Sequence, residues 1–360
     1  MMAQPFLRME QVSKTYAGVT ALDKVDFELE YGEIHCLVGE NGSGKSTLIK
    51  IISGAVKADP GCQVEIEGEI IHAHKAIDAI DRGIQVIYQD LSLFPNLTVA
   101  ENIALGELVR DHRRLVNWKE LRKIAQLAMV RIDVSLDLDA IVAEISIADQ
   151  QLVAICRSLT RDIKLIIMDE PTASLTRREV ESLLSVVLDM KSKGISTLFV
   201  SHKLNEVFQI ADRISVLRDG KKVGVFPSNE INEEKLTHLM TGKAVNYQNF
   251  NPVSNGFDPI LEVRNLSRSS EYENINLHLL PGEILGITGL LGSGRTELAL
   301  SLFGVTQPDS GQILFEQEEI KIHSIDDAMK IGIGYVPEDR LAQGLVNEQP
   351  VGDNFIITVI

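Results

Sequence analysis

A glycine-rich loop occurs twice in this chain of 360 residues, and it restricts the fold more than any other feature. Gly39 to Ser46 reads GENGSGKS and Gly289 to Thr296 reads GLLGSGRT, an offset of 250 residues. The first loop fits the pattern G-x-x-x-x-G-K-[ST], whereas the second has Arg295 at the lysine position. Such a loop joins a strand to a helix, so the sequence predicts alternating strands and helices.

The two halves of the chain also match outside the loops. The matching segments are YGEI at 31–34 and PGEI at 281–284, QVEI at 63–66 and QILF at 312–315, YQD at 88–90 and PED at 337–339, and VAEN at 99–102 and VGDN at 351–354. The nearly constant offset indicates a duplicated domain rather than a short-period repeat. We expect a first copy at 5–243, a linker rich in Asn, Pro, Gly and Ser at 244–259, and a second copy at 260–360. The second copy is expected to be incomplete, with residues 354–360 beginning a helix.

Composition and charge exclude several classes of protein. The net charge is −16 and the pI is about 5.0, which opposes nucleic-acid binding because a basic face is expected there. Cys36, Cys62 and Cys156 show no paired spacing, so neither a disulfide framework nor a zinc site is indicated. The sequence has no apolar run near the ~20 residues of a membrane-spanning helix and does not open on a signal peptide. We therefore expect a cytoplasmic protein, and any membrane role must act through a partner.

The first loop carries the residue types that bind phosphate. Its glycines let backbone amides turn toward phosphate oxygens, which the following helix N-terminus also faces. Lys45 can neutralise the outer phosphates as a compact charge, and the Ser46 hydroxyl can ligate Mg²⁺. The predicted binding residues are Gly39, Glu40, Asn41, Gly42, Ser43, Gly44, Lys45, Ser46 and Thr47.

Further polar residues follow apolar segments that read as buried strands. Lys164 to Met168 is followed by Asp169 and Glu170; Asp169 suits Mg²⁺, and Glu170 suits polarising an attacking water. A solvated acidic strand end is the alternative. His202 follows Thr197 to Ser201 and is a candidate for the γ-phosphate or the water, although a structural histidine is the alternative.

The local patterns predict a mostly parallel sheet covered by helices. The expected elements are strands at 34–38, 164–168 and 197–201, a helix at 46–53 stopped by Gly54, a helix from the capping box Thr176/Glu179 to about Gly194, and a hairpin at 213–218 and 221–226.

These motifs, in this order, resemble the nucleotide-binding domain of ATP-binding-cassette (ABC) proteins. The resemblance implies an α/β P-loop fold with a mostly parallel sheet, an antiparallel β subdomain and a helical subdomain, in two tandem copies of which the second is incomplete. It implies ATP and Mg²⁺ as ligands. Asp169 to Thr172 matches the Walker B segment, His202 the switch histidine, and Gln89 the glutamine that senses Mg²⁺ and a moving partner. Tyr16 matches the aromatic residue that stacks on adenine, with a core tyrosine as the alternative.

The tandem layout, with GLLGSGRTEL and GYVPEDR in the second copy, resembles the ATPase subunit of bacterial simple-sugar importers. The resemblance implies a hydrolase that energises import of a sugar or similar solute, peripheral to the cytoplasmic face of the inner membrane. Its partners would be permease subunits and, through them, a periplasmic solute-binding protein. The alternatives are a soluble tandem cassette acting on ribosomes or DNA, and a truncated product that binds nucleotide without hydrolysing it. The permease contact is expected within 89–107, including Leu91, Phe94, Pro95 and Leu97, unless these residues are buried.

Several positions depart from the ABC pattern. Residues 145–149 read ISIAD where the family has Leu-Ser-Gly-Gly-Gln, so Ser146 is kept while Ala148 and Asp149 differ. In the second copy Arg295 replaces the lysine, Glu338 falls where Gln89 would, and a shorter spacing deletes the Tyr16 equivalent. Because ABC cassettes pair head to tail, we expect one hydrolytic and one degenerate site in the complete protein. The 360-residue chain itself is expected to bind ATP but hydrolyse it slowly.

Overall fold

The computed structural model describes residues 5–71, 75–110, 116–173, 175–242, 257–289, 292–337 and 343–357. Backbone contacts divide the chain into two compact units, Met1–Tyr247 (unit one) and Gln248–Ile360 (unit two). The dividing point falls inside the predicted linker, of which only residues 257–259 are described, so the domain boundaries 5–243 and 260–360 stay predictions.

Unit one contains a six-stranded sheet in the order β10-β9-β3-β8-β7-β6. Its strands are β3 (Ile34–Val38), β6 (Ile84–Ile87), β7 (Leu165–Asp169), β8 (Ser196–Val200), β9 (Arg213–Arg218) and β10 (Lys221–Pro227). Only β10 runs antiparallel to its neighbour. Every residue of β3 and β8 is buried, as expected for a parallel sheet covered on both faces. The predicted strand at 34–38 is confirmed, and β7 and β8 lie one residue from their predicted bounds.

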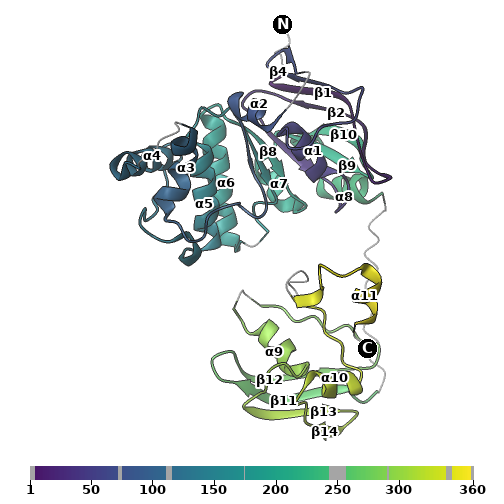
Figure 1. Ribbon diagram of the computed structural model, residues 1–360. Coiled ribbons are helices and arrows are strands. Elements are labelled where there is room, and N and C mark those ends of the chain that lie inside the picture. The colour runs from purple at the N-terminus through teal and green to yellow at the C-terminus, as the bar shows by residue number, and fades with distance from the viewer. Residues whose placement is uncertain are drawn as a thin grey trace. The chain divides into compact units, whose positions relative to one another are not determined.

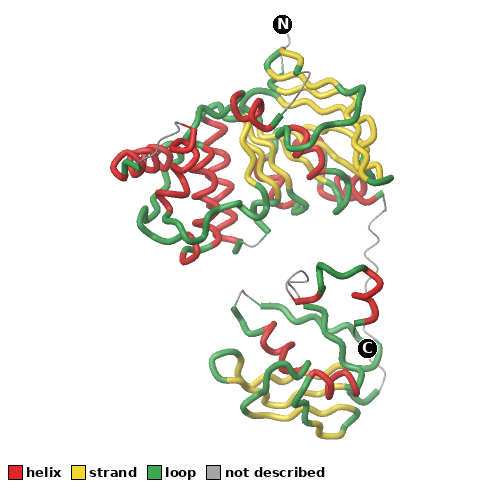
Figure 2. The backbone as a smooth tube through the Cα atoms, viewed as in Figure 1, coloured by secondary structure: helices red, strands yellow, loops and turns green. Residues whose placement is uncertain are grey.

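A four-stranded antiparallel sheet, in the order β2-β1-β4-β5, forms the β subdomain of unit one. Its strands are β1 (Leu7–Tyr16), β2 (Val19–Leu29), β4 (Gln63–Ile66) and β5 (Glu69–Ile70). Figure 2 shows these strands and the parallel sheet gathered at one end of unit one, with the longest helices at the other. The predicted combination of a parallel sheet, an antiparallel subdomain and a helical subdomain is confirmed.

Eight α-helices are described in unit one, and α3, α4 and α5 form the helical subdomain (Figure 1). They are α1 (Lys45–Ile52), α2 (Ala76–Asp81), α3 (Val99–Arg110), α4 (Trp118–Val130), α5 (Ile147–Ser158), α6 (Arg177–Ser192), α7 (Leu204–Ile210) and α8 (Glu233–Thr241). The capping box of Thr176 and Glu179 opens α6 as predicted. Gly54 follows the end of α1 with φ of 68°, the left-handed conformation that stops a helix.

Unit two contains a second four-stranded antiparallel sheet, in the order β12-β11-β13-β14. Its elements are β11 (Leu261–Arg268), β12 (Tyr272–Leu279), α9 (Arg295–Leu302), β13 (Ser310–Phe315), β14 (Glu318–Ile320), α10 (Ile325–Lys330) and α11 (Val351–Ile356). The helix predicted from Asn354 begins earlier, at Val351, because Pro350 sets the backbone angle at its N-cap and Asp353 favours the first turn. Residues 358–360 lie outside the described part of the chain.

The duplication extends to irregularities of the hairpins. Ser13 Oγ accepts a hydrogen bond from the Lys24 amide at 2.9 Å, and Ser267 Oγ accepts one from the Asn274 amide at 2.8 Å. A second such pair joins the Gln11 amide to Asp26 Oδ1 and the Asn265 amide to Asn276 Oδ1. These bonds sit at strand-register shifts in both units. The two units are therefore copies of one structural plan.

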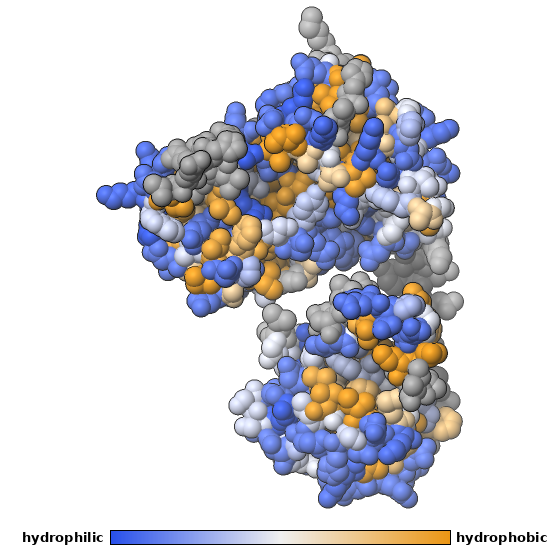
Figure 3. Space-filling model, viewed as in Figure 1, coloured by the Kyte–Doolittle hydropathy of each residue, from blue (hydrophilic) through white to orange (hydrophobic). Residues whose placement is uncertain are grey.

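The units differ in the segment that precedes the glycine-rich loop. In unit one this segment is β3, paired with β8 and β9. In the described part of unit two, residues 283–289 are paired with no strand, and Ile284 is 83 % exposed. Figure 3 shows apolar side chains at the surface of both units.

Candidate functional site

The glycine-rich loop of unit one runs from the end of β3 to the start of α1. A Cβ added to Gly39 would lie 2.3 Å from the Leu217 carbonyl oxygen and 2.5 Å from Ser43 Oγ, so only glycine fits. Gly44 is the N-cap of α1 with φ of 102°, again a conformation that glycine adopts readily. The loop is therefore drawn tightly around the helix N-terminus, where free amides attract anions.

Lys45 and Ser43 fit a phosphate ligand. Lys45 is only 6 % exposed, and its Nζ donates to the carbonyl oxygens of Gly39 at 2.8 Å and Glu40 at 3.0 Å. Burial lowers the pKa of Lys45, an effect opposed by Glu170 and Asp169. Ser43 Oγ is buried and has no hydrogen-bond partner among the described residues. The Lys45 ammonium group has only uncharged carbonyl acceptors in these two bonds, and phosphate oxygens entering the loop would supply it with anionic acceptors and the Ser43 hydroxyl with a partner.

Two adjacent carboxylates end β7. Burial and the neighbouring Glu170 raise the pKa of Asp169, while Lys45 and a hydrogen bond from Ser46 oppose that rise. Ser46 and Asp169 therefore lie side by side, as the predicted metal site requires. A hydroxyl and a carboxylate are oxygen ligands of the kind Mg²⁺ prefers, and a cation there offsets the repulsion between Asp169 and Glu170.

Glu170 is paired with His202. Glu170 has φ of 48°, a strained value for a non-glycine residue, and its amide donates to the Val200 carbonyl at 2.9 Å. This bend directs its carboxylate to His202, with 3.1 Å between Oε1 and Nδ1. Because an ionised carboxylate only accepts, Nδ1 carries the proton in this pair.

The remaining predicted site residues are Gln89 and Tyr16. Gln89 is exposed and follows β6, the strand beside β7. Tyr16 ends β1, is 40 % exposed, and has Lys14 Nζ 5.3 Å from its ring centroid. It is therefore no core tyrosine. The hairpin that carries it passes over the loop, since a Cβ added to Gly44 would lie 2.6 Å from the Ala21 carbonyl oxygen.

The site is assembled by four neighbouring parallel strands. In sheet order, β3 leads to the glycine-rich loop, β8 to His202, β7 to Asp169 and Glu170, and β6 to Gln89. Carboxyl ends of parallel strands meet at one edge of a sheet, which is where such folds bind ligands. The structure therefore brings together side chains that are far apart in the sequence.

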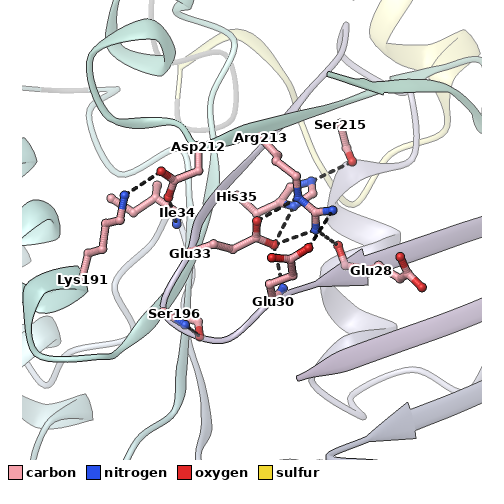
Figure 4. Close-up of polar contacts among 11 residues, drawn as sticks. Glu28, Glu30, Glu33, Ile34, His35, Lys191, Ser196, Asp212, Arg213 and Ser215 are labelled. Atoms are coloured by element: carbon pink, nitrogen blue, oxygen red, sulfur yellow. Dashed lines mark hydrogen bonds and ion pairs between the residues drawn. The ribbon is translucent and has the colours of Figure 1, made fainter. Parts of the chain in front are cut away.

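Buried ionic contacts hold β3 at its other end. Glu33 accepts from Arg213 Nε and Nη2 at 2.9 Å each, and from His35 Nδ1 at 3.1 Å. Figure 4 shows the Arg213 and His35 side chains meeting at this carboxylate, with Ser215 beyond the imidazole. Burial raises the pKa of Glu33, but the hydrogen bonds from His35 and Arg213 outweigh it and lower the pKa to about 2. The strand that supplies the loop is thereby anchored to β9.

Two features of the site were not predicted from the sequence. Ser146 caps α5, and its hydroxyl exchanges hydrogen bonds with the amide and carboxylate of Asp149. The Ser-x-x-Asp spacing was a readable signal for this cap. Glu206, which is 2 % exposed, contacts Thr172 and Ser201 behind the Glu170–His202 pair. Its only sequence signal was an acidic residue in an apolar helix.

The second glycine-rich loop differs in its charged residue and its hairpin. Gly294 begins α9 as Gly44 begins α1, but Arg295 is exposed where Lys45 is buried. A Cβ on Gly294 would meet the Glu271 carbonyl and Tyr272, so these residues are the counterparts of Ala21 and Leu22. Arg268 pairs with Tyr272 across a loop of three residues, where Lys14 and Leu22 are separated by seven. The predicted deletion of a Tyr16 counterpart is therefore confirmed, whereas Leu290, Leu291 and Glu338 lie outside the described residues.

The fold and the site together define a nucleotide-binding P-loop ATPase. A family model described as ABC transporter matches residues 22–173 and 272–356. The chain is 41% identical over 359 residues to ribose import ATP-binding protein RbsA 2 of Rubrobacter xylanophilus, covering 99% of this chain and 69% of that protein. It is 41% identical over 350 residues to ribose import ATP-binding protein RbsA of Corynebacterium glutamicum, covering 97% and 66%. This chain belongs to the ABC transporter family.

Solved structures agree with this assignment. An ATP-binding cassette of an ABC transporter in its ADP conformation is 28% identical, with a TM-score of 0.59, and the match covers 68% of this chain and 98% of that one. A dimeric ATP-binding cassette in a post-hydrolysis state with ADP and Pi is 26% identical, with a TM-score of 0.54, covering 62% and 98%. Of the helices that the structure describes, none has the length and apolar character to cross a membrane.

Proposed function

We propose that this chain is the ATP-hydrolysing subunit that energises import of a sugar, or a similar small solute, through a membrane permease. The observation that carries the proposal is the meeting of Lys45, Asp169 and the Glu170–His202 pair at one edge of the parallel sheet. The sugar class is supported by relatives named for ribose import that match nearly the whole chain.

The proposed roles follow from the contacts. The loop residues 39–47 hold the phosphates, Lys45 exchanges its carbonyl acceptors for phosphate oxygens, and Tyr16 stacks on adenine. Ser46, Asp169 and Gln89 are proposed to hold Mg²⁺, which, when bound, neutralises charge that develops on the phosphates.

Glu170 is the proposed general base, and its carboxylate accepts the proton of the attacking water. The water oxygen then forms a bond to the γ-phosphorus while the bond to the bridging β–γ oxygen breaks. His202 donates Nδ1–H to Glu170, which holds the carboxylate in one orientation.

We further propose that the loop after Gln89 contacts the permease. Asn102 is completely buried; its Oδ1 accepts from the Phe94 amide at 2.8 Å and its Nδ2 donates to the Phe94 carbonyl at 3.0 Å. Arg157 donates to the carbonyls of Leu91 and Ser92. Phe94 itself is 49 % exposed, so a rigid loop presents an apolar side chain to solvent. Leu91 and Leu97 are half-buried, and of the predicted contact residues Phe94 and Pro95 are the exposed ones.

Unit two contains the same arrangement, in which one asparagine side chain bonds both the amide and the carbonyl of a loop residue. This repetition supports a permease contact made by both units. Asn354 binds the amide of Val346 through Oδ1 at 2.8 Å and the carbonyl of Val346 through Nδ2 at 3.0 Å. Two such loops suit two permease subunits. A periplasmic solute-binding protein as the source of solute, and a position at the cytoplasmic face of the inner membrane, belong to the same proposal.

The test is coupled transport. The protein, reconstituted with its cognate permease in vesicles that enclose ATP and Mg²⁺, is expected to drive uptake of external sugar and to fail after Glu170→Gln. Phe94→Asp is expected to weaken association with the permease while ATP binding stays intact. Full ATP hydrolysis with no permease association, and recovery with ribosomes instead, contradicts the import function.

A further inference from the structure

We propose that Glu206 is a positioning residue for hydrolysis: it ties the loop after β7 to the segment after β8 and thereby holds Glu170 and His202 together. The inference rests on the hydrolytic roles proposed above for those two residues. It concerns a side chain that touches neither the expected nucleotide nor the water, and acts through its neighbours.

Glu206 is buried inside this junction. It lies in the first turn of α7 and is 2 % exposed. Its Oε2 accepts from Thr172 Oγ1 at 2.6 Å and from Ser201 Oγ at 3.4 Å. Thr172 stands two residues after Glu170, and Ser201 directly precedes His202. One carboxylate oxygen therefore joins the two segments that carry the catalytic pair.

Lys203 completes the junction. Its Nζ lies 3.5 Å from Glu206 Oε1 and donates to the Thr172 carbonyl at 2.8 Å. Its backbone amide donates to Ser201 Oγ at 3.0 Å. The β7–β8 ladder ends at the pair Asp169 and Val200, immediately before these residues. The cluster of Thr172, Ser201, Lys203 and Glu206 thus continues the link between the strands after their backbone pairing stops.

Helix capping alone does not account for the burial of Glu206. Glu179 occupies the corresponding third position of α6 and accepts from Thr176 Oγ1 at 2.7 Å, yet it is only half-buried. A capping carboxylate in this protein therefore does not need to be fully buried. Burying a carboxylate costs free energy unless its hydrogen bonds and charge partner return it. For Glu206 that cost is offset by its contacts with Thr172, Ser201 and Lys203, which lie in the segments that carry Glu170 and His202.

The consequence is geometric. Glu170 and His202 form their 3.1 Å contact from two different loops, and His202 is half exposed, so packing does little to fix its ring. A connection one residue from His202 and two residues from Glu170 limits how far the two loops can separate. Because displacing a reacting group by ~1 Å can cost about 100-fold in rate, a modest loosening is measurable.

The experiment compares Glu206→Gln with the matched control Glu179→Gln in the full chain. Glu206→Gln keeps the size of the side chain but weakens its bonds to Thr172, Ser201 and Lys203. We expect it to displace the ring-nitrogen NMR signals of His202, assigned with His202→Asn, and to lower the rate constant of ATP hydrolysis about tenfold with an unchanged KM. Glu179→Gln is expected to leave both readouts at the wild-type value.

A second variant covers the case in which Glu206→Gln folds poorly. Thr172→Val removes the other end of the 2.6 Å bond and is expected to reproduce the shift and the rate loss, with no further loss in the double variant. Unmoved His202 signals, or a rate loss matched by Glu179→Gln, overturn the inference. If Glu170→Gln and His202→Ala leave hydrolysis unaltered while Glu206→Gln still moves the His202 signals, the hydrolytic roles fail and the positioning role stands.

Discussion

The two units follow one plan, yet among the described residues a parallel sheet is present in unit one alone. Both contain the antiparallel hairpin with its paired irregularities and a glycine-started helix after the loop. The hairpin strands are adjacent in sequence, so the hairpin forms from local pairing. The strand before the loop needs β8 and β9, which come more than 150 residues later in unit one. Local elements therefore repeat wherever their sequence repeats, whereas parallel pairing needs distant partners.

The two glycine-rich loops also differ in the environment of their charged residue. Lys45 is buried beside two carboxylates, while Arg295 is exposed. In place of the hairpin end that carries Tyr16, unit two has a shorter turn closed by an ion pair of Arg268 and Glu271. A guanidinium fork does not replace a compact ammonium in a tight loop. We therefore expect unit one to dominate nucleotide binding and hydrolysis.

The largest expected effect is on turnover. Glu170→Gln should lower ATP hydrolysis by a factor of about 100 or more, because general-base assistance contributes roughly 10²–10⁴ in rate. Arg295→Ala should change it much less. Steady-state phosphate release by both variants in the complete protein measures the difference, and equal losses would contradict the assignment of one hydrolytic and one degenerate site.

Nucleotide affinity should show the same asymmetry. Lys45→Ala removes one partner of a buried charge interaction, which costs about 2–5 kcal/mol, so Mg-ATP affinity should fall at least about thirtyfold. Arg295→Ala should leave it within about threefold, since an exposed charge contributes little. Titration calorimetry on the full chain checks both. An unchanged affinity in Lys45→Ala would remove the basis of the proposed site.

Stability should depend on Glu33 but not on its counterpart Glu283. Glu33→Gln breaks a buried ionic contact and should lower the free energy of unfolding of unit one by about 3 kcal/mol. Glu283 is exposed and, within the described part of the chain, accepts from the Leu280 amide alone, so Glu283→Gln should have little effect. Urea unfolding of each variant gives the comparison.

The contribution of Glu33 should also depend on pH. Its pKa is lowered from 4.5 to about 2 by folding, so the contribution is complete above pH 4.5 and is lost as the pH falls toward 2. Wild type and Glu33→Gln should therefore converge in stability over that range. A constant difference down to pH 2 would show that folding does not lower the pKa of Glu33.

The smallest expected effect concerns adenine. Tyr16→Ala should weaken ATP binding about tenfold, because stacking contributes ~1–3 kcal/mol per base. The affinity for inorganic triphosphate, which has no base, should not change, and Tyr16→Phe should keep the wild-type affinity for ATP. Arg268→Ala in unit two should leave both affinities unaltered. A parallel loss of triphosphate affinity in Tyr16→Ala would indicate that the hairpin positions the loop rather than the base.

Local sequence patterns were sufficient to predict the strands and helices that carry the site. The apolar run before Gly39, the capping box at Thr176 and the turn at 219–220 each predicted an element within a residue or two. The one misplaced start, in α11, arose because Pro350 acts at the N-cap before the apolar residues that marked the helix. Such patterns depend on neighbouring residues, so they are readable without the fold.

The amino-acid sequence alone therefore determined the duplication, the identity of the loop residues and the divergence at Arg295. Only the tertiary structure decided that β3, β8, β7 and β6 are neighbours in that order, and hence that Lys45, His202, Glu170 and Gln89 follow neighbouring strands. It also decided that Glu206 is buried at their junction. The physical reason is that parallel strands pair across long crossovers, and a side chain's burial depends on every segment packed around it.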